Sequence, residues 1–291
     1  MAIRIGVLGN CDTGGVSYAL RAMLSEHEVI AFTPPGKADE RDAWYAELPT
    51  KSDVILVNNS VFKGTARPLL EPSLDKIQRY PMSQFAAFHP DCCYVGVKAT
   101  KLLIFPAYNS AICVAGYVRG LTQAQVYDLF CADVFDKLGY FDGWDPSVAH
   151  MQAEFTECAM DFRPFYLKVK RLGAFMHSMN HPKAETLITL ARFLALGFGA
   201  SKEVLEMPVA LSDGLAGLDW PLYPEIGEVY GLRGSYSWKM AGELVDLRSF
   251  IARSFERYAE LGLTAEGVFF GHHDFHTRFG NLLNERGIGN G

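Results

Sequence analysis

An amide and a thiol, Asn10 and Cys11, follow the first apolar run of the chain. The run IRIGVLG is typical of a buried strand that ends at Gly9. The residues from Gly14 onward have the apolar spacing of a helix, so Cys11 lies near its expected N-terminus, where the helix dipole favours a thiolate. Cys11 is therefore a candidate nucleophile or the neighbour of a substrate thiol. The alternative is a small residue that fills a tight turn.

Two further segments also end in polar residues. The run VILV ends at Asn58, Asn59 and Ser60, and the segment SQFAAF, interpreted as a strand, ends at His89. Ligands of open parallel α/β sheets bind beyond the carboxyl ends of the strands. These side chains are therefore expected to meet in one crevice with those that follow the first strand.

The residue types in this crevice suit acyl chemistry. Groups that can donate a hydrogen bond to an oxyanion are present at Asn10, Asn58, Asn59 and Ser60. His89 is a candidate general base, and Asp91 would either orient it or cap a turn. The alternative for the amides and the hydroxyl is turn formation, which Asn and Ser favour.

A second polar group precedes the helix predicted after residue 182. The segment HSMNHPK contains Ser178, Asn180, His181 and Lys183. Pro182 is expected to begin the helix, and a helix N-terminus is where anions bind, although Ser or Asn at this place can also be a simple cap. Lys239 lies at the end of a loop rich in Pro, Gly, Trp and Tyr, which suits a binding loop or a packed aromatic core.

The segment GHHDFH near the C-terminus contains His272, His273, Asp274 and His276. A metal site is one interpretation. The spacing does not match HExxH, and no CxxC pair is present in the chain, so surface or substrate-facing histidines are favoured and no metal is expected.

Strands alternate with helices over the first hundred residues, which predicts an α/β fold with a parallel sheet. Strands are expected over 3–9, 27–34, 52–60 and 83–95, with helices over 14–26, 37–49 and 72–81. The second half is predicted to be mostly helical. We expect a single domain over 1–291, with an α/β subdomain over about 1–105 and a helix-rich subdomain over about 106–291.

The composition excludes several classes of protein. The 291 residues are 49% hydrophobic and 21% charged, with a net charge of −6, so the chain is expected to be globular, and duplex nucleic acid is a poor candidate partner. No secretion signal and no apolar stretch of about 20 residues is found in the sequence. We therefore expect a soluble cytoplasmic protein with reduced cysteines; the oligomeric state is not readable.

Several stretches, taken in order, resemble the WcbI-type polysaccharide-biosynthesis acetyltransferase family. They are GNC, FHPD, NSAI, HSMNHPK, YPEIG and GSYSWK, which run from the N-terminus to Lys239. The family commonly has Gln where Asp12 follows Cys11, and often His where Asn109 precedes Ser110.

The resemblance implies a coenzyme A-binding transferase that acetylates a sugar hydroxyl in capsule or exopolysaccharide biosynthesis. Acetyl-CoA would be the donor, and a sugar or sugar nucleotide the acceptor. Cys11, His89, Asn10 and Ser60 would then be catalytic, and Cys11 would be either an acetyl carrier or the neighbour of the coenzyme thiol. The residues implied to hold the coenzyme are Gly9, Asn58, Asn59, Ser110, Ser178, Asn180, His181, Lys183 and Lys239.

Two other functions stay open. An esterase or deacetylase resembling the SGNH hydrolases would also place its catalytic residues at the ends of parallel strands, although no clear nucleophilic serine follows the first strand. A non-catalytic protein of a polysaccharide-assembly complex is the third hypothesis. The non-catalytic hypothesis ranks last because polar residues gather at several strand ends.

Overall fold

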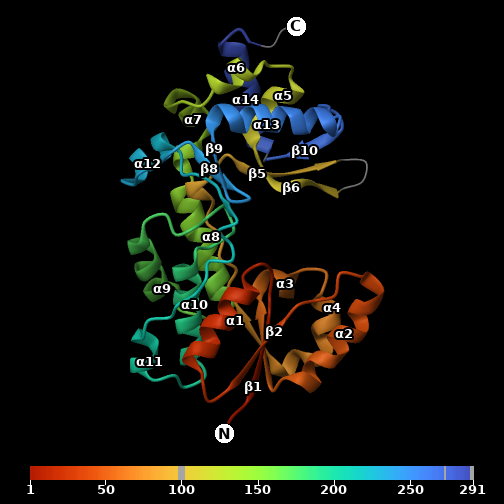
Figure 1. Ribbon diagram of the computed structural model, residues 1–291, viewed down its shortest axis with the longest axis vertical. Helices are drawn as coiled ribbons and strands as arrows, with labels where there is room; N and C mark the ends of the chain where they lie inside the picture. Colours follow the sequence, from red (N-terminus) through yellow and green to blue (C-terminus); the bar gives the residue numbers. More distant parts are fainter. Residues whose placement is uncertain (98–101, 272, 289–291) are drawn as a thin grey trace. The chain divides into compact units, whose positions relative to one another are not determined.

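The computed structural model describes residues 1–97, 102–271 and 273–288 (Figure 1). The chain folds into two compact units. Unit 1 contains residues 1–84 and 148–216, and unit 2 contains residues 85–147 and 217–291. The subdomain boundary expected near residue 105 lies inside a strand of unit 2, and the description of 1–291 as a single domain stays a prediction.

Unit 1 is built on a parallel sheet with strand order β2-β1-β3-β4. Strands β1 and β3 carry buried Ile, Val and Leu side chains on both faces of the sheet, as expected for parallel strands covered by helices. The bounds of the strands are Arg4–Leu8 (β1), Glu28–Phe32 (β2), Val54–Asn58 (β3) and Ile77–Tyr80 (β4). The predicted α/β fold with a parallel sheet in the N-terminal part is confirmed.

The helices of unit 1 come from two distant stretches of chain (Figure 1). Those of the first stretch are α1 (Thr13–Met23), α2 (Ala38–Lys51), α3 (Asn59–Lys63), α4 (Arg67–Leu70) and the 3₁₀ helix η1 (Glu71–Lys76). Those of the second are α8 (Trp144–Glu157), α9 (Phe162–Val169), η4 (Lys170–Leu172), α10 (Ala184–Leu196) and α11 (Lys202–Glu206). Helix α1 packs on α10 so closely that a Cβ atom at Gly15 would lie 2.5 Å from Leu187 Cδ1.

Three predicted elements of this region were wrong in part. Helix α2 does not stop at Pro49 but continues to Lys51, and the Thr50 hydroxyl donates to the Glu47 carbonyl within this last turn. The segment 72–81, predicted as a helix, is η1 followed by β4, because Ile77–Tyr80 pairs with β3. The fourth parallel strand is therefore β4 and not the segment 83–95.

Unit 2 is rich in helices, as predicted, and also contains two antiparallel sheets that were not predicted. Their strands are β5 (Cys92–Val97), β6 (Leu102–Ser110) and β10 (Val268–Phe270) in one sheet, and β7 (Leu218–Asp219), β8 (Ser237–Met240) and β9 (Glu243–Asp246) in the other. Its helices are η2 (Ala86–Phe88), α5 (Ala111–Val118), α6 (Gln123–Tyr127), α7 (Ala132–Leu138), η3 (Tyr140–Asp142), α12 (Pro224–Tyr230), α13 (Leu247–Glu260) and α14 (His273–Glu285).

Within the described part of the chain, none of the helices has both the length and the apolar character that crossing a bilayer requires.

Candidate active site

The ends of strands β1 and β3 meet, as the polar residues after them predict. The Asn10 side-chain amide donates to Ser60 Oγ at 2.7 Å, and Ser60 Oγ donates to Asn58 Oδ1 at 2.7 Å. The Ser60 backbone N–H also donates to Asn58 Oδ1, at 3.0 Å. Because β1 and β3 are neighbours in the sheet, these three side chains form one hydrogen-bonded chain at its carboxyl edge.

A buried carboxylate, Asp12, accepts hydrogen bonds from two of these residues. It accepts from the Asn10 backbone N–H at 3.1 Å and from the Asn58 side-chain amide at 2.9 Å. Burial raises the pKa of Asp12 to about 6, although these hydrogen bonds oppose the shift. A Cβ atom at Gly9 would lie 2.2 Å from the Tyr80 hydroxyl oxygen and 2.8 Å from Asp12 Oδ1, so a residue without a side chain is required there.

Cys11 is exposed and lines a pocket of about 320 Å³. We call it the thiol pocket. Its walls are the first turn of α1, the first turn of α10 and a loop that lies between α11 and β7; the lining residues are Cys11, Gly14, Gly15, Tyr18, Ala184, Leu187 and residues 211–215. The amide groups at the two helix N-termini favour negative charge near the thiol.

The histidine segment before α10 is fixed to the wall of the thiol pocket. His177 Nε2 donates to Asp213 Oδ2 at 2.8 Å, and the Ala184 backbone N–H donates to the same oxygen at 3.1 Å. The His177 N–H donates to the His181 carbonyl at 2.7 Å. Asp213 and Ala184 both line the pocket, so this segment lies in the same unit and at the same pocket as Cys11.

The predicted coenzyme residues of this segment differ in exposure. Ser178 is fully buried, and its hydroxyl lies 3.5 Å from Asn180 Oδ1. His181 is half-buried; burial, together with the neighbouring His177, lowers its pKa. Lys183 is half-buried and directly precedes α10. Pro182 does not begin that helix, because it pairs with Met176 as an isolated bridge instead.

Asn59 faces away from the Asn10–Ser60 contact. Its side-chain amide donates to Glu154 Oε2 at 3.0 Å and to Glu157 Oε2 at 2.8 Å. Lys63 bonds both carboxylates at 2.8 Å, and the Met82 backbone N–H donates to Glu154. In this structure Asn59 therefore joins α3 to α8, and its predicted role in coenzyme binding stays a prediction.

The buried member of this ionic cluster is expected to dominate its contribution to stability. The Glu154 side chain is 7% exposed and the Glu157 side chain 44%. Glu154→Ala removes the acceptor of Lys63, Asn59 and the Met82 amide, and should lower the free energy of unfolding by about 2 kcal/mol. Glu157→Ala, the matched control, should cost less than about 1 kcal/mol. Urea denaturation of the two variants measures the difference, and equal losses would contradict the assignment.

The remaining predicted site residues belong to unit 2. His89 is 3% exposed and lies between η2 and β5, so the expectation that it ends a parallel strand is wrong. Ser110 is fully buried and caps α5 by accepting from the Cys113 N–H at 3.1 Å. Lys239 is exposed on β8. Roles of these three residues in catalysis or coenzyme binding stay predictions.

Asp91 is also in unit 2, and its surroundings are those of a buried structural carboxylate. It is fully buried and accepts from the Tyr140 hydroxyl at 2.9 Å, the Tyr223 hydroxyl at 2.7 Å and the Ile112 N–H at 3.0 Å. Burial raises the pKa of Asp91. These contacts join the start of α5 to η3 and α12.

The histidine-rich segment near the C-terminus is described only in part. His272 lies outside the described residues. His276 Nε2 donates to the Phe270 carbonyl at 2.7 Å. Among residues 1–97, 102–271 and 273–288, no group of three or more His, Cys, Asp or Glu side chains is placed to hold a metal ion.

With the geometry established, the chain can be compared with known proteins. The family model described as polysaccharide biosynthesis enzyme WcbI matches residues 4–203. The chain belongs to the WcbI family. The match includes Cys11, the residues at 58–60 and the segment that ends at Lys183, so the predicted resemblance is confirmed.

A solved WcbI structure has the same fold. It superposes with a TM-score of 0.70 at 15% sequence identity, over 98% of this chain and 96% of that one. It is described as a novel polysaccharide biosynthesis enzyme, in its native form without a disulfide bond between coenzyme A and one of its cysteines. The comparison with curated proteins finds no match. Membership of the WcbI family makes this chain one of the polysaccharide biosynthesis enzymes.

Sequence reasoning missed the wall of the thiol pocket that faces α1. Asp213 and its neighbours at 211–215 lie in an irregular loop, more than 30 residues after His177. The tripeptide Ser-Asp-Gly marks a turn there. Nothing in its local pattern indicates that this turn lines the same pocket as Cys11.

Proposed function

We propose that this protein binds acetyl-CoA with the thioester beside Cys11 and transfers the acetyl group to a sugar hydroxyl in polysaccharide biosynthesis. The observation that supports the proposal most directly is an exposed thiol in a pocket lined by two helix N-termini. Coenzyme A presents a thiol at one end and phosphates along its length, so both features of the pocket match it. The description of the related structure, which names coenzyme A together with a cysteine, agrees with this placement.

The donors for an oxyanion are the side chains beside Cys11. The Asn10 amide has two N–H groups and uses one of them for Ser60, so the second can donate to the oxygen of a tetrahedral intermediate. Asp12 fixes the Asn10 backbone, and Asn58 fixes Ser60. This arrangement is held before substrate binds, which is the condition for effective electrostatic stabilisation.

The transfer takes place in two steps. The Cys11 thiol gives up its proton and its sulfur attacks the thioester carbonyl; the bond from that carbon to the coenzyme sulfur breaks, and the coenzyme takes up the proton and leaves as its thiol. The sugar oxygen then attacks the acetyl-cysteine carbonyl, the bond to Cys11 breaks, and the hydroxyl proton passes through a general base back to the cysteine. His89 is the base predicted from sequence, and His181, whose lowered pKa keeps it neutral at pH 7, is a second one within unit 1.

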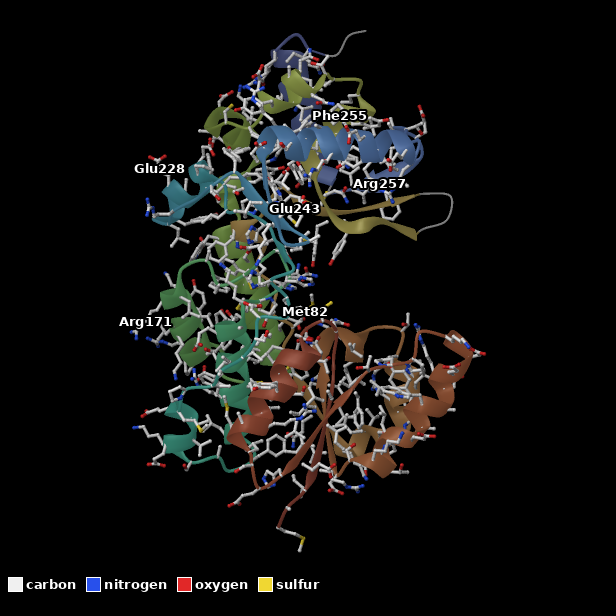
Figure 2. The ribbon with its side chains drawn as sticks, viewed as in Figure 1. Met82, Arg171, Glu228, Glu243, Phe255 and Arg257 are labelled. Carbon is white, nitrogen blue, oxygen red and sulfur yellow. The ribbon has the colours of Figure 1, made fainter. Side chains whose placement is uncertain are left out.

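Lys183 is proposed to bind a phosphate of the coenzyme. It directly precedes the α10 turn that forms one wall of the thiol pocket, so cation and helix N-terminus act on the same side. Lys239 and Ser110 of unit 2, with Gly9, Asn58, Asn59, Ser178 and Asn180, retain their predicted part in coenzyme binding. Arg171, which is exposed at the surface of unit 1 (Figure 2), is a further candidate for a phosphate contact.

Calorimetry with coenzyme A tests the binding step. The wild type should bind the coenzyme, and Lys183→Ala should weaken binding about tenfold, because one charge-assisted phosphate contact is lost. Lys202→Ala, an exposed lysine on α11 that does not line the pocket, is the control and should change nothing. No heat with the wild type at millimolar coenzyme would refute the proposal, and hydrolysis of sugar acetates without coenzyme would favour the esterase hypothesis.

A further inference from the structure

A second pocket opens on the other side of the Asn10 side chain. Its volume is about 480 Å³, and it lies between the ends of β1 and β2, helices α2 and α3, and the turn before α4. Helices α2 and α4 lie side by side in this part of unit 1 (Figure 1). We call it the polar pocket, because its lining includes Asn10, Arg41, Asp42, Ser60 and Thr65.

The two pockets share one dipeptide. Asn10 lines the polar pocket, and the next residue, Cys11, lines the thiol pocket. Ser60, which accepts a hydrogen bond from Asn10, also lines the polar pocket. The residue that would carry the acyl group and a residue that lines the polar pocket are therefore neighbours in the chain, so the two pockets lie on either side of one peptide bond. Transfer between two bound substrates requires such proximity of their sites.

The charges of the polar pocket favour an uncharged ligand. Among its lining residues, Arg41 and Asp42 are the charged ones, and they balance each other. Arg41 also donates to the carbonyls of Pro35 and Gly36, at 3.2 and 3.4 Å. A pyrophosphate or a phosphate monoester would meet no excess of positive charge here, because Asp42 offsets Arg41.

The hydrogen-bonding groups of the polar pocket match a polyol. A sugar hydroxyl both donates and accepts, and the lining offers a carboxylate that accepts, a guanidinium that donates, and an amide and two hydroxyls that do both. Val61, Leu69 and the ring of the buried Tyr45 supply apolar wall between them. A concave surface that combines convergent polar groups with apolar wall is typical of small-molecule sites.

We propose that the polar pocket binds the acceptor of the acetyl group as an uncharged sugar ring. The inference rests on the proposed acetyl transfer, and it adds the location of the acceptor and its charge class. If the acceptor is a sugar nucleotide, the sugar occupies the polar pocket and its phosphates lie outside.

Ligand-observed saturation-transfer NMR on the full chain tests this assignment. The probes are methyl α-D-mannopyranoside, methyl β-D-galactopyranoside, D-glucuronate and uridine diphosphate, each at millimolar concentration. The wild type should give signals with at least one methyl glycoside and weaker signals with the two anions. Thr65→Trp, a change at an exposed residue that fills the pocket, should abolish the glycoside signal, and Asp42→Ala should weaken it about tenfold.

Asp39→Ala is the matched control, because Asp39 is exposed on the same helix and outside the lining. It should leave the glycoside signal unchanged. The affinity for coenzyme A, measured by calorimetry, should stay within about twofold of the wild type in all three variants. Loss of coenzyme binding in Thr65→Trp would overturn the inference, since the polar pocket would then belong to the coenzyme.

The failure of the inference is distinguishable from the failure of the proposed function. Absence of any glycoside signal with the wild type, a stronger signal with the anions, or a glycoside signal that persists in Thr65→Trp would each refute the inference while coenzyme binding stands. Absence of coenzyme binding in the wild type would refute the proposed function, whatever the glycosides do.

Discussion

Replacing Cys11 with serine should lower the rate of acetyl transfer by about 1000-fold or more, while the affinity for coenzyme A stays within about threefold of the wild type. The hydroxyl of serine is a far weaker nucleophile than a thiolate at neutral pH. Helix α1 and α10, which form the walls of the thiol pocket, are not disturbed by an exchange of one sulfur for oxygen.

The covalent step gives this prediction a direct readout. With acetyl-CoA and no acceptor, the wild type should gain the mass of one acetyl group on the peptide that contains Cys11, and Cys11→Ser should not. Cys158→Ser is the matched control within unit 1, because burial raises the pKa of the Cys158 thiol to about 12 and leaves it protonated. Retention of more than about a tenth of the activity in Cys11→Ser would show direct transfer, with the thiol as a bystander.

The second large effect is on stability, through the buried Asp12. Burial raises the pKa of this carboxyl in the folded protein to about 6, from its ordinary value of 3.8. A group whose folded pKa is raised loses its contribution to stability as the pH increases, so the wild type should be destabilised between about pH 4 and pH 6 by about 3 kcal/mol. Asp12→Asn removes this titration, and its stability relative to the wild type should rise by that amount over the same interval.

Urea denaturation of the proteins from about pH 2.5 to about pH 8 measures the difference, and groups common to both cancel. Asp53→Asn provides a control of opposite sign. Hydrogen bonds from Arg4 lower the pKa of the exposed Asp53, so this variant should lose stability relative to the wild type as the pH rises through the acid range. A difference between Asp12→Asn and the wild type that does not change with pH would refute the raised pKa.

The elements that position Asn10, Asn58 and Ser60 could be predicted from sequence. The apolar runs before them are long enough for central strands of a parallel sheet, and such strands end at one edge. Asn59 could not be placed, because it is the first residue of α3 and successive helical side chains point in different directions. Asn58 therefore belongs to the contact with the end of β1, whereas the next residue, Asn59, bonds Glu154.

His89 and β4 show what periodicity leaves undetermined. The segment SQFAAF is apolar because Phe85 and Phe88 pack with Trp144 in an aromatic cluster, and not because it is a strand. Strand β4 has four residues, two of them Gln78 and Arg79, and only its pairing with β3 decides its conformation. In both segments contacts distant in sequence outweigh the local pattern.

The interleaved order of the two units has a consequence for biosynthesis of the chain. The ribosome completes the β1–β4 sheet by Gln84, but α8, which bonds Asn59, and α10, which packs on α1, are made only after the first residues of unit 2. Until about residue 200 has left the exit tunnel, the apolar surface of α1 that packs against Leu187 in the native protein is therefore exposed to solvent. A chaperone that binds this exposed surface during synthesis should raise the yield of native protein more than one that acts after release.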